Sequence, residues 1–457
     1  MTRIQPASPS DAQTRARVRL ERTLLVIGVI ALGFNLRGAI TSLPPIYPEL
    51  QTQLGLSGAT VSVLAATPVI CFGVVSGFAA VFARRLGEER VLFGAIIALT
   101  AGLLLRAGAP STLLFPGTIL AGAAIAVMNV LLSSLIKRRW PERAGMLIGL
   151  YITALSVGAI AGSVVSVPLY TASGGSLLVT LGWLAAPAAL AGLLWLPQLK
   201  SADAQPSARA TATSRSQSSD RTDAADSGPP VRSAAVRLAV RRHALAWQVM
   251  LFMGLQSLVY YATLSWLPSI LRDRGESAAG AGDLLAVMGV GNLAVSLVVP
   301  VIAQRLRAQH ALVVPTVAAI AGGLAGLVYA PLGSAVAWAL ILGAGQNAAL
   351  ALAIFFTAAR SPDAATAASL SAFSQAAGYL LASAGPLGVG LLHAATGTWT
   401  ASVIVLFALT AIMLLFGLLA ARPRTLPGLL PTTPAPPDLL STGPDAPPEG
   451  EAMMGER

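Results

Sequence analysis

Charged residues are scarce in this sequence: they make up 11% of its 457 residues, against roughly 25% in an ordinary soluble domain. Hydrophobic residues make up 55%, and the mean hydropathy is +0.72. A soluble globule would need far more polar surface, so a membrane-embedded protein is predicted instead. The 44 glycines fit that interpretation, because small residues let helices pack closely inside a bilayer.

Several kinds of chemistry lack the residues that they need. The single cysteine, Cys71, cannot form an internal disulfide, and no Cys/His cluster is present for zinc or redox chemistry. There is no Walker A loop, and all 19 acidic residues lie outside the interiors of the long apolar runs. Without a nucleophile–base pair or paired carboxylates inside those runs, we expect no enzyme activity, and we also expect no metal and no cofactor.

The apolar runs predict an all-α membrane protein with twelve transmembrane helices, since a bilayer core needs about 20 residues per helix. They form two sets of six on either side of a long polar segment. The first set covers approximately 23–43, 58–83, 90–107, 111–136, 143–170 and 176–196, and the second covers 244–271, 279–304, 309–330, 334–358, 364–392 and 398–421.

Composition divides the chain into five parts. Residues 23–197 and 244–421 are predicted to form two six-helix bundles, and residues 1–22 a short N-terminal segment. Residues 198–243 are rich in Ser, Ala, Arg and Asp and are expected to be a flexible linker, and the Pro-rich residues 422–457 a disordered tail.

The distribution of basic residues predicts the orientation. All but four of the 30 Lys and Arg residues fall in the termini, in the linker, or in the loops on the same side of the membrane as these segments. The exceptions are Arg37, Arg106, Arg272 and Arg274. By the positive-inside rule, both termini and the linker face the cytoplasm of a bacterial-type plasma membrane. The net charge of +11 therefore indicates an anionic lipid surface and no nucleic acid, since no aromatic residues alternate with these arginines.

Two sequence patterns recur in the two halves. Arg139-Trp140-Pro141-Glu142-Arg143-Ala144 and Arg360-Ser361-Pro362-Asp363-Ala364-Ala365 share R-x-P-[E/D]-x-A, and Leu43-Pro44-Pro45-Ile46 resembles Leu267-Pro268-Ser269-Ile270. Because both matches fall at equivalent places in a six-plus-six chain, they predict an internal duplication, with a solute path between two pseudo-symmetric bundles.

Arg37 is the one charged residue predicted at membrane depth. An unpaired arginine there costs about 2.5–3.5 kcal/mol, so its side chain should face a cavity, helix carbonyls or an anionic ligand. Asn35 lies about 200° away around a helix of 3.6 residues per turn. Both residues are candidates for the solute site, although they can point into one cavity only if Gly33 or Gly38 breaks the helix.

Polar and aromatic residues in the second half supply the other candidates. Gln256 and Tyr260 share a helix face, and Gln375 and Tyr379 repeat the same i, i+4 spacing, which favours two walls of one pocket. Asn129, Tyr261, Trp266, Gln346 and Asn347 are secondary candidates; the alternative for the amides is a bridge between two helices. Gly158, Gly162 and the pair Gly385-Pro386 indicate close helix packing and bending.

The chain resembles the major facilitator superfamily. The loop from Arg84 to Arg90 resembles its R-x-G-[RE]-[RK] signature, with Arg84 where an aspartate is usual. Within that superfamily the chain resembles the cyanate and 2-nitroimidazole permeases. The matching stretches are Asn35-Leu36-Arg37, Ile136 to Arg139, Gly254 to Ser257 with Trp266 to Pro268, and Leu370 to Trp399.

The resemblance implies a rocker-switch carrier of a small anionic or nitro-bearing solute. It places Asn35, Arg37, Gln256, Tyr260, Gln375 and Tyr379 at the solute site. Loop residues that would control the conformational change are Arg84, Arg85, Gly87, Glu88, Arg90, Arg139, Glu142, Arg143, Arg360 and Asp363.

A secondary or facilitative transporter, acting as a monomer in the lipid bilayer, is thus the leading hypothesis. One alternative is a drug/proton antiporter for lipophilic compounds, against which the lack of a membrane-embedded carboxylate counts. The other is a transporter-like sensor or scaffold whose linker or tail binds a protein.

Overall fold

The computed structural model describes residues 26–427 except 109–110, 204–237, 297 and 307–308. Every regular element in these residues is a helix, as the apolar runs predict. The predicted N-terminal segment, most of the linker and most of the tail lie outside the described residues. At the two ends of the predicted linker, helix continues to Asp203 and resumes at residues 238–241.

The first half of the chain supplies six apolar helical segments, close to the predicted ranges. Pro44 and Pro45 end the first helix, because proline cannot donate a backbone hydrogen bond, and a short turn leads on into α2. The sixth predicted span is divided by a turn at 183–184. The elements are residues 26–41, η1 (Pro44–Ile46), α2 (Tyr47–Leu54), α3 (Gly58–Leu86), α4 (Glu88–Ala107), α5 (Leu114–Arg139), α6 (Ala144–Ala172), α7 (Leu177–Gly182) and α8 (Ala185–Asp203).

The second half repeats this plan. Its elements are α11 (Ala244–Asp273), α12 (Ala278–Ser296), α13 (Val298–Arg305), α14 (His310–Tyr329), α15 (Ala335–Ala359), α16 (Ala364–Thr396) and α17 (Thr400–Ala420). Across the described residues, 11 helical segments are long and apolar enough to cross a membrane. A shorter apolar helix, Ala278–Leu293, stands at the eighth predicted span, 279–304, and brings the number of apolar segments to the predicted twelve.

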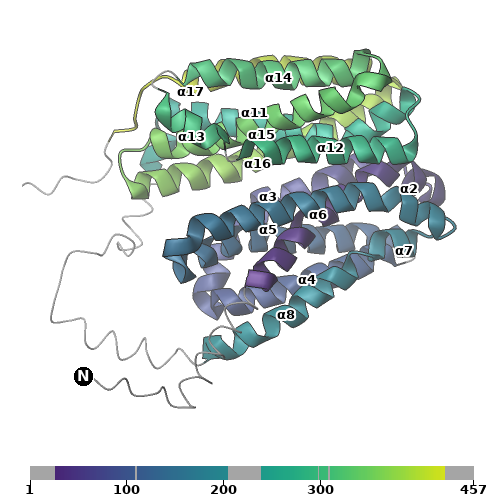
Figure 1. The fold of residues 1–457 in the computed structure, drawn as a ribbon, viewed down its shortest axis with the longest axis horizontal. Helices are drawn as coiled ribbons and strands as arrows, with labels where there is room; N and C mark the ends of the chain where they lie inside the picture. Colours follow the sequence, from purple (N-terminus) through teal and green to yellow (C-terminus); the bar gives the residue numbers. More distant parts are fainter. Residues whose placement is uncertain (1–25, 109–110, 204–237, 297, 307–308, 428–457) are drawn as a thin grey trace, which may run out of the picture.

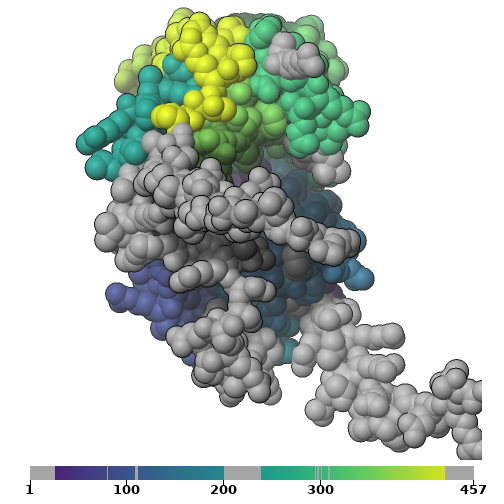
Figure 2. Space-filling model, turned by 90° about the vertical axis from the view of Figure 1, so that its left-hand side faces the viewer, coloured from purple at the N-terminus to yellow at the C-terminus, as the bar shows by residue number. Residues whose placement is uncertain are grey.

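The helices form two bundles, one from each half of the chain. Figure 1 shows α3 to α8 below and α11 to α17 above, and Figure 2 shows the same two halves from the end. The bundles meet mainly where α3 packs against α16 and where α6 packs against α12. In the six-plus-six scheme these are the second span against the eleventh and the fifth against the eighth, so the two contacts are equivalent under the predicted duplication.

A repeated polar contact gives further support to the duplication. At the end of α5, Arg139 Nη2 donates to Glu89 Oε1 at 2.9 Å, and Glu89 lies in the first turn of α4. At the equivalent place in the second half, Arg360 Nη2 donates to Gln309 Oε1, just before α14. Each half therefore anchors the arginine of its R-x-P motif to the start of the preceding long helix.

Close helix packing makes one glycine in α6 hard to replace. A Cβ atom added at Gly158 would lie 1.9 Å from the Phe34 carbonyl oxygen, whereas one added at Gly149 would meet nothing within 4 Å. We expect Gly158→Ala to destabilise the protein by about 1–3 kcal/mol through overpacking. The matched variant Gly149→Ala should have a melting temperature close to that of the parent protein.

The measurement is the melting temperature of each purified variant in the same detergent. Equal melting temperatures for Gly158→Ala and Gly149→Ala would contradict the close approach of α6 to the first helix.

Candidate functional site

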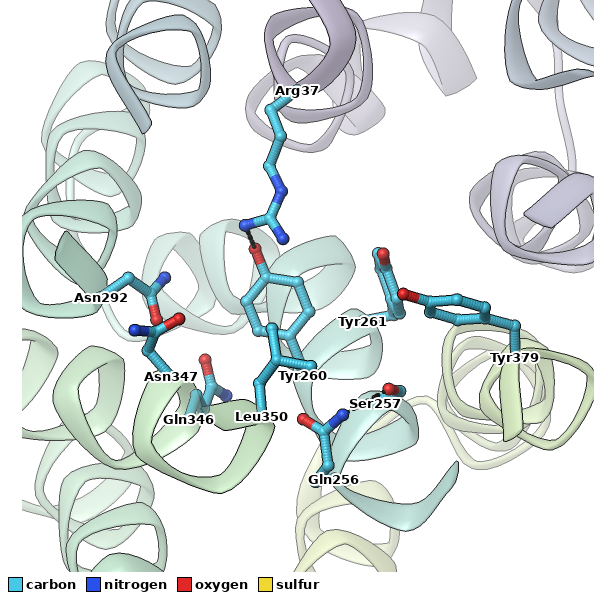
Figure 3. A pocket seen from close by; sticks show the side chains of 10 residues that line it. All are labelled: Arg37, Gln256, Ser257, Tyr260, Tyr261, Asn292, Gln346, Asn347, Leu350 and Tyr379. Carbon is cyan, nitrogen blue, oxygen red and sulfur yellow. Dashed lines mark hydrogen bonds between the residues drawn. The ribbon is translucent and has the colours of Figure 1, made fainter. Parts of the chain in front are cut away.

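Arg37 reaches from the first helix into a cavity between the two bundles. Its Nη1 atom donates a hydrogen bond of 2.9 Å to the hydroxyl of Tyr260 on α11 (Figure 3). That neutral hydroxyl is the one hydrogen-bond partner of the guanidinium among the described residues. Within the described part of the chain no carboxylate pairs with this charge, so its remaining donors can take an acceptor from a solute.

The second half supplies every other side chain that lines this cavity. The cavity has a volume of about 30 Å³, against roughly 10–15 Å³ for one water by the same measure. It is lined by Arg37, Gln256, Ser257, Tyr260, Tyr261, Asn292, Gln346, Asn347, Leu350 and Tyr379 (Figure 3). The lining is polar and carries a single formal charge, that of Arg37.

Aromatic rings form one side of the cavity. Tyr261 contacts Tyr260 edge-on, with ring centroids 5.0 Å apart, and Tyr379 from α16 lies 6.4 Å from Tyr261. Phe72 from α3 lies 5.8 Å from Tyr379, so both bundles contribute to this aromatic cluster. Tyr151 of α6 also lies near Arg37. The guanidinium therefore has tyrosines of both bundles near it.

Four of the predicted site residues do not line the cavity. The first helix is unbroken, and Asn35 accordingly points away from Arg37, with its amide donating to the Ala31 carbonyl at 2.8 Å. Gln375 is exposed and bonds Ser371. Asn129 accepts from Tyr151 at 2.9 Å, and Trp266 donates to the Pro386 carbonyl at 2.8 Å, so both serve helix packing.

Three lining residues are missing from the residues predicted for the site: Ser257, Asn292 and Leu350. Ser257 follows Gln256 and accepts from its amide nitrogen at 2.6 Å. The sequence does mark Asn292, because it is an amide inside an apolar run, but such an amide fits a bridge between helices equally well. Nothing in the sequence marks Leu350, because it is one leucine among many in an apolar helix. Tyr151, near Arg37, was also not predicted.

The predicted conformational loops contain the anchors described above and several exposed residues. Arg138 bonds Glu88 at 3.1 Å, next to the Arg139–Glu89 pair. Gly87 has a φ of 87°, a conformation that few residues other than glycine adopt, where α3 gives way to α4. The residues with exposed side chains are Arg84, Arg85, Arg90, Glu142 and Arg143.

In the second half, Arg360 and Asp363 hold the equivalent loop together. Arg360 Nε donates to the Ala420 carbonyl at 2.8 Å, which ties the end of α15 to the end of α17. Burial lowers the pKa of this guanidinium, which nonetheless keeps its charge at neutral pH. Asp363 caps α16 by accepting from the Thr366 backbone at 2.8 Å.

At the opposite end of the molecule an ion pair joins the two bundles. Arg272 Nη1, near the end of α11, lies 2.9 Å from Glu49 Oε1 on α2 and 3.3 Å from the Pro45 carbonyl. Nearby, Tyr47 packs against Trp266 with ring centroids 5.6 Å apart. These contacts hold the two bundles together at that end.

Two bundles of apolar helices around a polar cavity define a multi-pass membrane transporter, which is a carrier and not an enzyme. The chain belongs to the Major Facilitator Superfamily, whose family model matches residues 24–386.

Its relatives include two proteins of Escherichia coli with named solutes. A "2-nitroimidazole transporter" is 34% identical over 88% of this chain and 96% of its own length, and the "Cyanate transport protein CynX" is 28% identical over 82% and 91%. An "Uncharacterized transporter YycB" of Bacillus subtilis is 36% identical over 89% of this chain and 95% of its own length.

Solved structures share the fold. The nucleoside transporter NupG superposes with a TM-score of 0.68 at 14% identity, covering 88% of this chain and 99% of its own. A D-xylose–proton symporter gives a TM-score of 0.65 at 17% identity, with coverage of 88% and 99%. At such identities the likeness concerns architecture alone.

Proposed function

We propose that this protein transports a small anionic or nitro-bearing solute by alternating access, and that the cavity around Arg37 is its binding site. The observation that carries the proposal is the Arg37 guanidinium, bonded to the neutral Tyr260 hydroxyl in a cavity without a carboxylate among its lining residues. A guanidinium presents a planar fork of donors that suits carboxylate-like and nitro oxygens. An anionic solute would neutralise this partly buried charge, and an anionic or a nitro-bearing solute would accept from its donors.

The size of the cavity supports a small solute. A volume of about 30 Å³ corresponds to roughly two or three waters by the same measure. The names of two relatives, a 2-nitroimidazole transporter and a cyanate transport protein, agree with a small solute that carries hydrogen-bond acceptors. Lipophilic drugs fit this site less well, because they need a larger apolar surface.

The contacts between the bundles support a proposal for the transport cycle. The Glu49–Arg272 pair closes one end, and a solute could leave toward that end only after the pair separates. We further propose that this end is extracytoplasmic, that both termini face the cytoplasm, and that residues 198–243 link two bundles which rock against each other. A monomer contains the whole cavity, so no second subunit is required.

A ligand screen tests the proposed function. Purified protein in detergent is heated with cyanate, nitrate, nitrite, bicarbonate, short carboxylates or 2-nitroimidazole, with chloride at equal ionic strength as the control. A ligand that binds only the folded state at 100 times its Kd adds about 2.7 kcal/mol of stability, so a saturable rise in melting temperature is expected for at least one of them.

The alternatives give different results in the same protein. Stabilisation by lipophilic cations alone, together with flux that follows a pH gradient, would replace this proposal with a drug/proton antiporter. Loss of a cellular response on deletion of residues 204–237, with no ligand binding, would indicate a sensor.

A further inference from the structure

Three carboxamide side chains gather in the part of the cavity away from the tyrosine cluster. They are Asn292 on α12 and the adjacent Gln346 and Asn347 on α15. Figure 3 shows them together on one side of Tyr260, with Tyr261 and Tyr379 on its other side. Amides offer both donors and acceptors, so this group can bind a different kind of atom from those that Arg37 can bind.

Close backbone packing holds the amide group in place. A Cβ atom added at Gly343 on α15 would lie 2.0 Å from the Met288 carbonyl of α12, and one at Gly291 would lie 2.4 Å from the Leu340 carbonyl of α15. The two helices therefore cannot slide past each other without breaking these contacts. The amides of α12 and α15 keep a fixed position relative to each other.

Gln346 differs from the other buried glutamine of the cavity in its hydrogen bonds. Its side chain is 3% exposed, yet neither Oε1 nor Nε2 has a hydrogen-bond partner among the described residues. Gln256 is 4% exposed and donates to Ser257 at 2.6 Å. A buried amide without partners is unfavourable, and a bridge between helices does not explain it, because a bridging amide would be bonded. A solute that pairs both atoms does explain it.

We propose that Gln346, flanked by Asn292 and Asn347, binds the end of the solute opposite to the group held by Arg37. This inference rests on the proposed function. That end must carry a hydrogen-bond donor for Oε1 and an acceptor for Nε2. The solute class is then a small planar compound with an anionic or nitro group at one end and an N–H beside a ring nitrogen or a carbonyl at the other. An inorganic anion such as nitrate fills only half of the site.

The first test needs no ligand. Gln346→Leu removes a buried amide that has no partner and keeps the side-chain volume similar, so the unliganded protein should melt higher by about a few degrees. Gln256→Leu is the matched control: it removes the amide that donates to the Ser257 hydroxyl, so its melting temperature should be lower than that of the parent. A lower melting temperature for Gln346→Leu would show that its amide is bonded within the protein and would overturn the proposal.

The second test compares two ligands. 4-Nitropyrazole and its 1-methyl derivative carry the same nitro group opposite a ring edge with two adjacent nitrogens, but methylation removes the N–H donor from that edge. Isothermal titration should show the parent protein binding the N–H compound at least about tenfold more tightly, because a site built to bond a polar group rejects an analogue that lacks it. In Gln346→Leu that preference should fall to within about twofold.

Three contrary outcomes have distinct meanings. If methylation has no effect on binding that depends on Arg37, the amide subsite is wrong and the proposed function stands. If the preference persists in Gln346→Leu, it is steric, and the subsite is again wrong. If neither compound nor any ligand of the screen binds, the proposed function fails and this inference fails with it.

Discussion

Arg37→Gln is expected to weaken solute binding by about 10- to 100-fold. Hydrogen bonds to charged groups contribute about 1.5–3 kcal/mol, and each 1.4 kcal/mol is a factor of ten. Glutamine keeps one donor group but loses the charge and the planar fork, whereas Arg37→Lys keeps the charge and should lose less. Titration of the purified protein and flux in proteoliposomes should both report the loss.

The design separates a local effect from a general loss of positive charge. Arg305, exposed at the end of α13, gives the matched control Arg305→Gln, which removes the same charge outside the cavity. Tyr260→Phe removes the hydroxyl that orients Arg37 and should weaken binding by a smaller factor than Arg37→Gln. Equal losses in Arg37→Gln and Arg305→Gln would show that Arg37 makes no specific contact with the solute.

The helices could be predicted from the sequence because the bilayer imposes one simple rule, about 20 apolar residues per span. The same rule explains the deviations. Gly182 is the last residue of α7 and Pro187 lies in the first turn of α8, so Gly and Pro flank the turn that a count of apolar residues passes over. The extension of α8 to Asp203 runs through residues with linker-like composition, so composition alone does not predict where α8 ends.

The cavity could be predicted only in part, because its residues come from different helices. Arg37 stood out as a charge at membrane depth, and Tyr260 shares a helix face with Gln256. Periodicity also showed that Asn35 and Arg37 point apart, which the unbroken first helix confirms. The contribution of Asn292 depends on the packing of α12 against α15, which no spacing along one helix encodes.

The same limit applies to Gln375. Its i, i+4 spacing from Tyr379 repeats the Gln256–Tyr260 pattern, yet Gln375 is exposed and only Tyr379 reaches the cavity. A shared face of about one turn is wide enough for one residue to line a cavity and the other to miss it. Helix rotation about its own axis is set by packing, here by α16 against α3 and α11.

Reversing one charge of the Glu49–Arg272 pair is expected to open that end of the protein. Glu49→Arg places two arginines beside each other, and Arg272→Glu places two glutamates there. The pair is partly exposed, with side-chain exposures of 15% and 24%, so losing its attraction is worth about 1 kcal/mol or less. Like-charge repulsion adds to this, and we expect an overall shift of about tenfold toward the open state, which is about 1.4 kcal/mol.

Opening can be measured with a cysteine at position 265. Ser265 is buried beside Tyr47, about two helical turns before Arg272 on α11. In a Cys71→Ser background, Ser265→Cys should react with a membrane-impermeant maleimide about tenfold faster in either charge-reversed variant. The double exchange, Glu49→Arg with Arg272→Glu, recreates an ion pair of opposite sense and should bring the rate back toward the parent. Since a transporter must open and close this end in every cycle, flux should fall in the two single variants and recover in the double exchange. If the double-exchange protein is labelled as fast as the single variants, the ion pair does not hold the bundles together.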